Sequence, residues 1–256
     1  MIRAFLAGAR IQLQFLRAYP DALIPFFTAP MFSVIFLMIF RHAGRTDLTA
    51  YAAIAPVFIA LWWLALFNSG WTITIERWNG TLEMLVAAPS SFAAVILGRI
   101  TATTMVGIVS FGETWLVARL LFGTRITIYH TWGFLATALV TLAAMAGTAV
   151  AMSSLFVLAR NAVTFSNSAS YPFYVLGGIL VPVSVLPHWI RPVSSVVFLS
   201  WSADLLRAAL RPGPMHHFAF RLGMVALLGA CGLVVGAWTM RVILVRVRGS
   251  GELGTT

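Results

Sequence analysis

Lysine is absent from this sequence, and acidic residues are scarce, with seven aspartates and glutamates among 256 positions. Charged residues make up 9% of the chain, whereas a typical soluble domain carries about 25%. Hydrophobic residues make up 60% of the chain, and the mean hydropathy is +0.93. A soluble fold could not cover so apolar a core with polar surface. We therefore expect an all-α integral membrane protein.

The missing lysine also excludes two classes of chemistry. A nucleotide-binding P-loop places a lysine on the phosphates, and Schiff-base catalysis needs a lysine amine, so this chain can use neither. The single cysteine, Cys231, cannot form an internal disulfide. No H-E-x-x-H motif occurs, and the adjacent pair His216 and His217 lacks the spacing that holds a metal on one helix face. We expect no metal site and no catalytic residue.

The positive charge has an ordinary explanation in a membrane protein. A net charge of +10 would suit a nucleic-acid-binding protein. The arginines, however, are scattered between apolar runs instead of being gathered on one face, which favours contacts with lipid phosphates at the membrane surface. We expect the lipid bilayer, and no nucleic acid, as a partner.

Six apolar stretches could cross a bilayer, which requires about 20 residues each. They cover approximately residues 22–40, 50–75, 92–121, 131–158, 163–180 and 222–240. Six spans place both termini on one side of the membrane. The basic residues near both ends favour the cytoplasmic side, so we expect a multi-pass protein of the cytoplasmic membrane.

Residues 1–19 have the pattern of an amphipathic helix that lies in the membrane interface. Arg3, Arg10 and Arg17 recur every seven residues, so they share one face of a helix. A different face carries four apolar residues: Phe5, Ala9, Leu13 and Leu16. A soluble lead-in is the alternative.

Glu113 is an acidic residue inside the third apolar stretch. A carboxylate in hydrocarbon costs several kcal/mol unless it is protonated, paired or solvated. One interpretation places Glu113 on a translocation pathway or a subunit interface. The other places it near the outer end of the span, in reach of water and paired with Arg119 or Arg125.

A short polar stretch, ERWNGTLEMLVAAP at 76–89, separates two long apolar segments. The Asn79-Gly80 pair indicates a turn, Thr81 or Asn79 can cap a helix, and Pro89 ends it. The result is a helix of about two turns on the cytoplasmic side.

Two interpretations of this helix remain open. It could be a connector whose apolar face rests on the bilayer. Its deliberate turn and stop residues instead favour docking into a groove of a soluble partner. The docking face would be Leu82, Leu85 and Val86. The residues that set its orientation would be Glu76, Arg77 and Glu83.

The stretch 177–213 is too rich in proline for one helix and too apolar for a solvated loop. Two short half-helices that dip into the membrane would fit, because broken backbone is tolerated there when protein or water covers it. We place this re-entrant region at 181–213.

Both motifs resemble those of bacterial ABC-type-2 exporter permeases. The first matches the pattern E-R-x-x-G-T-L-E-x-L-x-x-[ST]-P, apart from Ala88 where serine or threonine is frequent. The second matches a glycine-rich helix end, an L-P-x-W turn and an L-R-A-A-L run. It includes Gly178, Pro182, Pro187, Trp189 and Pro192. The resemblance covers essentially the whole chain, which would form a single transmembrane domain over 1–256.

The resemblance implies a division of labour. The permease would be a subunit of a homo- or heterodimer, with ATP and Mg bound by two separate ATPase subunits and no cofactor on this chain. Residues 76–89 would form the coupling helix that inserts into the ATPase, and the half-helices would form an outer gate. The substrate would be an amphiphile such as a drug, a lipid or a lipid-linked glycan. The alternatives are a membrane scaffold or, less in keeping with the missing chemistry, an intramembrane enzyme.

The aromatic residues of the first two spans are candidates for an apolar substrate path, although such residues more often pack in a core or face lipid. They are Phe26, Phe27, Phe32, Trp62, Trp63 and Phe67.

Overall fold

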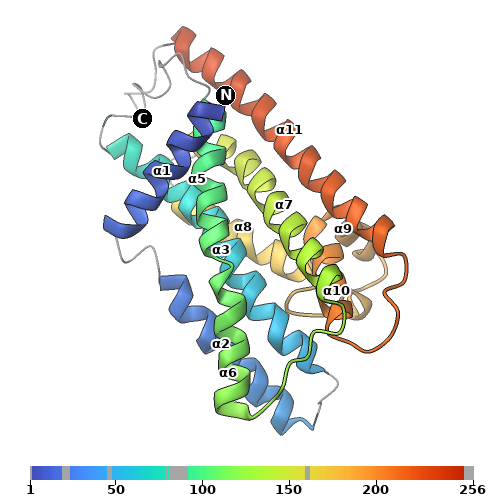
Figure 1. Cartoon of the computed structure of the whole chain (residues 1–256). Helices are drawn as coiled ribbons and strands as arrows, with labels where there is room; N and C mark the ends of the chain where they lie inside the picture. Colours follow the sequence, from blue (N-terminus) through green and yellow to red (C-terminus); the bar gives the residue numbers. More distant parts are fainter. Residues whose placement is uncertain are drawn as a thin grey trace.

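The computed structural model of the chain describes residues 2–18, 24–44, 48–78, 80, 92–158 and 162–250, and all regular structure among them is helical. Figure 1 shows one elongated bundle. Its helices are α1 (Ile2–Ala18), α2 (Ile24–His42), α3 (Thr49–Trp78), α5 (Phe92–Val106), α6 (Val109–Phe122), α7 (Thr131–Leu158), α8 (Ala162–Leu176), η3 (Val183–Val185), α9 (Arg191–Val196), α10 (Phe198–Ala209) and α11 (Phe218–Ser250).

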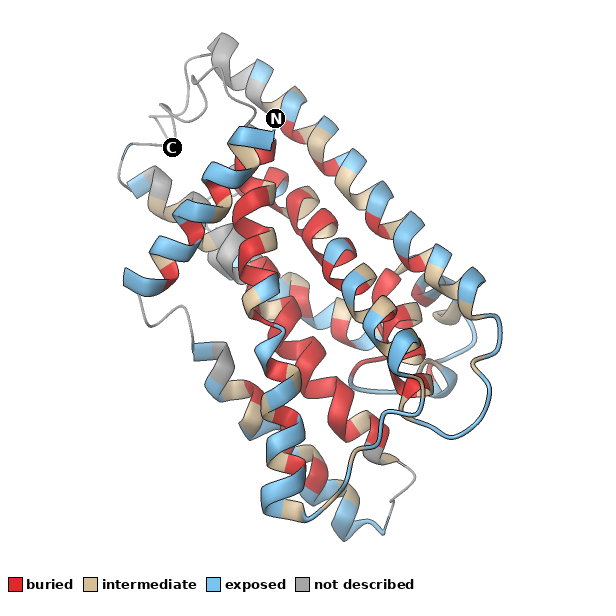
Figure 2. Ribbon diagram, viewed as in Figure 1, coloured by how far each residue is buried: buried red, intermediate tan, exposed pale blue. Residues whose placement is uncertain are grey.

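The core of the bundle forms around α3 and α7. Helix α3 packs against α2, α5, α6, α7, α8 and α10, and α7 also contacts α11. The largest fully buried side chains include Phe58 and Trp62 of α3 and Met145 and Phe156 of α7. Figure 2 shows this buried layer running through the middle of the bundle, whereas α2 and α11 expose much of their surface. The exposed side chains on those outer helices are largely apolar, as expected for contact with lipid.

The described residues contain three helical segments that are long and apolar enough to cross a membrane: Ala94–Phe122, Thr131–Phe156 and Phe218–Ile243. Helices α2 and α3 contribute shorter apolar segments, Phe27–His42 and Ala50–Leu66. The all-α membrane fold is therefore confirmed at this coarser level. The arrangement of six spans remains a prediction.

The third predicted span is not one regular helix. Helix α5 ends at Val106 and α6 begins at Val109. Between them the backbone tightens, since the Ile108 N–H donates to the Met105 carbonyl at 3.2 Å and the Ser110 N–H to the Gly107 carbonyl at 3.0 Å. These are bonds across three residues, as in a 3₁₀ turn. A Cβ at Gly107 would lie 2.5 Å from a methyl group of Leu61, so glycine lets the turn approach α3.

A seam of small residues joins α11 to α7. Cβ atoms at Gly229 and Gly236 would lie within 2.6 Å of backbone atoms of Ala144 and Ala151. The missing side chains let the two backbones approach closely, which is how helices pack in lipid without a hydrophobic driving force. Further along the seam, the Ser154 and Thr239 hydroxyls share a hydrogen bond of 2.8 Å.

Candidate functional site

The predicted coupling stretch connects α3 to α5. Helix α3 continues through the backbone of Glu76 and Arg77 and ends at Trp78, beyond the expected end of the second span at residue 75. Gly80 has a φ of +66°, the left-handed conformation that glycine adopts without strain. This conformation agrees with a turn at the Asn79-Gly80 pair.

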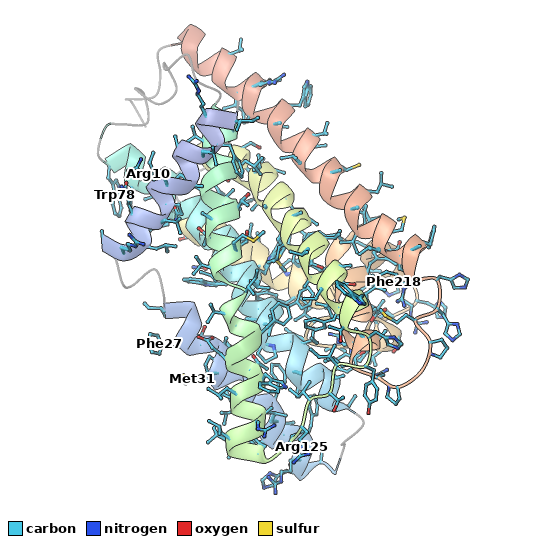
Figure 3. The ribbon with its side chains drawn as sticks, viewed as in Figure 1. Arg10, Phe27, Met31, Trp78, Arg125 and Phe218 are labelled. Carbon is cyan, nitrogen blue, oxygen red and sulfur yellow. The ribbon has the colours of Figure 1, made fainter. Side chains whose placement is uncertain are left out.

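The rest of the coupling stretch lies outside the described residues, so its predicted roles stay predictions. This holds for Thr81, Leu82, Glu83, Leu85, Val86 and Pro89, and for the side chains of Glu76 and Arg77. The described helices nevertheless fix its neighbourhood. In Figure 3, Trp78 at the end of α3 and Arg10 of α1 lie toward the same end of the bundle, so the stretch begins at that end.

Helix α1 crosses α5 in direct backbone contact. A Cβ on Gly8 would overlap the carbonyl oxygen of Val95, and a Cβ on Gly98 would overlap the carbonyl oxygen of Phe5. Only glycine at both positions allows this approach. Helix α5 follows the predicted coupling stretch in the chain, so α1 is packed onto one of the two helices that flank this stretch.

A polar contact reinforces the α1–α5 crossing. The Nε of Arg99 donates to Oε1 of Gln12 at 3.1 Å, and both residues are buried. This differs from the apolar face predicted for α1, because Leu13 is exposed whereas Gln12 is 1% exposed. The buried face runs through Gly8, Gln12 and Leu16, and the three arginines of α1 remain exposed as predicted. No pattern in the residues predicts that a glutamine would be buried here as the partner of an arginine from another helix.

The stretch after α8, residues 177–213, folds as short helices. Helix α8 ends in a turn at Gly178, whose φ is +63° and where a Cβ would lie 2.8 Å from Val183. Pro182 precedes η3, and Pro192 lies in the first turn of α9. Pro187 and Trp189 are exposed in the connection between η3 and α9. Two short helices, α9 and α10, thus lie where half-helices are predicted. That they dip into the membrane and form an outer gate remains a prediction.

Arginine side chains hold this region together. Arg191 donates to the carbonyl of Leu186 at 3.0 Å and to that of Ser184 at 2.7 Å, which closes the η3–α9 connection. Arg207 of α10 is 3% exposed and donates to the carbonyl of Gly178 at 2.6 Å. Its guanidinium carbon also lies 3.8 Å from the ring centroid of Tyr51. Arg207 therefore ties the end of α8 to α10 and to the start of α3.

Glu113 lies in α6, half-buried, and Oε2 has no hydrogen-bond partner among the described residues. The alternative that pairs it with Arg119 or Arg125 finds no ion pair in the part of the chain that the structure describes. Arg119 instead lies 5.9 Å from the ring centroid of Trp115. The assignment of Glu113 to a pathway or interface stays a prediction.

A largely apolar cavity of about 460 Å³ opens between α2, α3 and α8. Its lining includes Phe32 of α2, Trp63 of α3 and Tyr171 and Tyr174 of α8, with Asn167 and Ser170 as polar groups. Of the aromatic candidates, Phe32 and Trp63 thus line it. Trp62 is buried in the core, packed against Phe173 with ring centroids 4.7 Å apart.

Two other aromatic candidates fall outside the described side chains, namely Phe26 and Phe67, and Phe27 is exposed on the surface of α2 (Figure 3). The described residues contain no group of three histidine, cysteine, aspartate or glutamate side chains that could hold a metal ion. The cavity offers aromatic surface and a few hydrogen-bonding groups, the features of a ligand-binding pocket.

Comparison with protein-family models finds one match, a family described as "ABC-2 type transporter", over residues 4–210. The matched segment runs from α1 to the end of α10 and so includes the α1–α5 crossing, the coupling stretch and the cavity. Searches of curated proteins and of solved structures return no match.

Proposed function

This chain belongs to the ABC-2 type transporter family and is a membrane-embedded permease component, not itself an ATPase; from that premise we propose that it exports an amphiphilic substrate across the cytoplasmic membrane. A drug, a lipid or a lipid-linked glycan would suit. The observation that carries the proposal is the family match over most of the chain. Two ATPase subunits and a second permease subunit, identical or different, would complete the transporter.

The cavity between α2, α3 and α8 supports an amphiphilic substrate. Its aromatic side chains offer apolar surface, and Asn167 and Ser170 offer polar groups at one wall. Its volume of about 460 Å³ falls in the range of ligand pockets, roughly 300–1,000 Å³. An amphiphile that enters from the bilayer would exchange its contacts with lipid for contacts with these aromatic and polar side chains.

The path of energy input would begin at the coupling stretch. The apolar face of Leu82, Leu85 and Val86 would insert into a groove of the ATPase. Movement of that groove would be passed to α3 and α5, which flank the stretch. Because Gly8 and Gly98 lock α1 onto α5, α1 would move with them. Both termini would lie on this cytoplasmic side.

The coupling assignment is tested by Glu83→Arg. With the permease and its ATPase co-expressed and reconstituted, we expect the charge reversal to release the ATPase or to reduce ATP hydrolysis by about tenfold, as for the loss of a charged contact worth roughly 1.4 kcal/mol. Thermal unfolding of the permease should be unchanged. Glu252→Arg makes the same reversal outside the stretch and serves as the control. Equal assembly and ATP hydrolysis in the two variants would refute the coupling role.

Export is tested with a fluorescent amphiphile and inside-out vesicles that contain the complex. ATP-dependent uptake, abolished by Glu83→Arg, is the expected result. A complex that assembles and hydrolyses ATP but takes up no amphiphile of any charge would favour the scaffold alternative.

A further inference from the structure

A second cavity, of about 480 Å³, lies at the other end of the fold from the coupling stretch. The start of α3, the C-terminal half of α10, the α10–α11 connection and the start of α11 form its walls. Unlike the cavity between α2, α3 and α8, its lining is rich in basic side chains. These are Arg207, Arg211, Arg221 and His216.

The charges that line this cavity do not balance. Among the described residues, Asp204 is the one acidic residue of the lining. It is shared, because Arg221 approaches one carboxylate oxygen at 3.1 Å and Arg207 the other at 3.6 Å. The Arg211 side chain has no hydrogen bond or ion pair within the part of the chain that the structure describes. With histidine neutral, the three arginines and one aspartate among the described lining residues leave two positive charges on the wall.

The cavity wall is held in place by neighbours. Arg207 is fixed by the Gly178 carbonyl and by the ring of Tyr51. On the other side, a ring nitrogen of His130 lies 2.7 Å from the carbonyl oxygen of Gly213, between two prolines of the connection. Arg211 and Arg221 therefore project from a braced frame. A preformed frame reduces the ordering cost of binding.

We propose that this cavity binds a phosphate-type anion through Arg211 and Arg221, with Arg207 supplying fixed positive charge behind them. Guanidinium groups match phosphate oxygens with paired hydrogen bonds, and Asp204 is the one competing carboxylate among the described lining residues. The site is separate from the cavity between α2, α3 and α8, and its existence does not depend on transport.

The same phosphate chemistry has two sources. One is the headgroup of an anionic bilayer lipid, and the other is a soluble phosphate or a phosphorylated cargo headgroup. The experiment uses the full-length protein in nanodiscs of phosphatidylcholine with or without phosphatidylglycerol. Lipid retention is read by native mass spectrometry, and inorganic phosphate is added as competitor in a parallel arm.

For the lipid source, we expect wild-type protein to retain phosphatidylglycerol over phosphatidylcholine, and Arg211→Gln to reduce that preference roughly tenfold. For the soluble source, we expect no preference between the two lipids. Inorganic phosphate should instead bind the protein in neutral nanodiscs, as measured by calorimetry, and Arg211→Gln should weaken that binding roughly tenfold. The control is Arg125→Gln, which removes an exposed arginine that does not line the cavity.

Asp204→Asn provides a variant with the opposite sign. It removes the competing carboxylate and frees Arg221, so the affinity for the anion should rise severalfold. Circular dichroism checks that the variant still folds. No binding of either anion to the wild type, or an equal loss in Arg211→Gln and Arg125→Gln, would overturn the proposal. The proposal would also be overturned if folded Asp204→Asn protein bound the anion more weakly than wild type while Arg211→Gln bound it with unchanged affinity.

Discussion

The absence of a side chain at Gly98 allows the close approach of α1 and α5. The position of its absent side chain is occupied by the carbonyl oxygen of Phe5, which belongs to a helix backbone and cannot rotate away. Gly112 of α6 is also helical, yet a Cβ there would meet nothing within 4 Å. The two glycines therefore make a matched pair for measuring the contact.

We predict that Gly98→Ala destabilises the protein by about 1–3 kcal/mol, the usual cost of overpacking. Gly112→Ala should be neutral or slightly stabilising, because alanine favours helix over glycine by up to about 1 kcal/mol. Thermal unfolding in detergent measures both. Similar midpoints for the two variants would mean that the α1–α5 contact contributes little to stability.

The partners of individual buried residues were beyond prediction from the sequence. Arg99 is a charge within an apolar stretch, but its bond to Gln12 joins positions 87 residues apart. Arg207 belongs to the L-R-A-A-L run, and its bond to Gly178 depends on how the whole stretch 177–213 folds. Such pairs require the packing of helices, which periodicity does not specify.

Elements were more predictable where their physical cause is local. The prolines and glycines of 177–213 correctly indicated short helices, because proline cannot continue a helix and Gly178 can adopt a positive φ. The break between α5 and α6 was not predicted. Glycine is common in membrane helices, and the residue that a side chain at Gly107 would meet, Leu61, lies on another element.

At the scale of elements, we predict that α1 and α5 move as one unit during turnover. In a Cys231→Ser background, Gln12→Cys and Arg99→Cys would be joined by a short thiol-specific crosslinker, since the native side chains lie in hydrogen-bonding contact. ATP hydrolysis and amphiphile uptake by the doubly substituted complex should be the same before and after crosslinking. A loss of turnover on crosslinking would show that the two helices slide during the cycle.

For the whole molecule, composition alone predicted a helical membrane protein. A chain with 60% hydrophobic and 9% charged residues has too few polar side chains to cover its apolar ones in water. The number of crossings is harder to establish. Three described helical segments have the length and apolarity of a membrane span, and the spans predicted at 22–40, 50–75 and 163–180 remain predictions.

Arg10 and Arg125 lie at opposite ends of the molecule in Figure 3 and give a direct test of its orientation. With Cys231 replaced by serine, we expect Arg125→Cys to react with a membrane-impermeant thiol reagent on intact cells. Arg10→Cys should react only after permeabilisation. Reaction of both variants from the same side would refute the proposed topology.

The seam between α7 and α11 also determines how α11 tolerates sequence change. Substitutions at Gly229 and Gly236, even to alanine, should be depleted in a saturation-mutagenesis library selected for expression, because they meet backbone of α7. Val234 and Trp238 are exposed, so exchanges among apolar residues should persist there. The number of tolerated substitutions at each position of α11 would then rise and fall with the helical repeat. The positions that tolerate fewest would mark the side of α11 that faces α7.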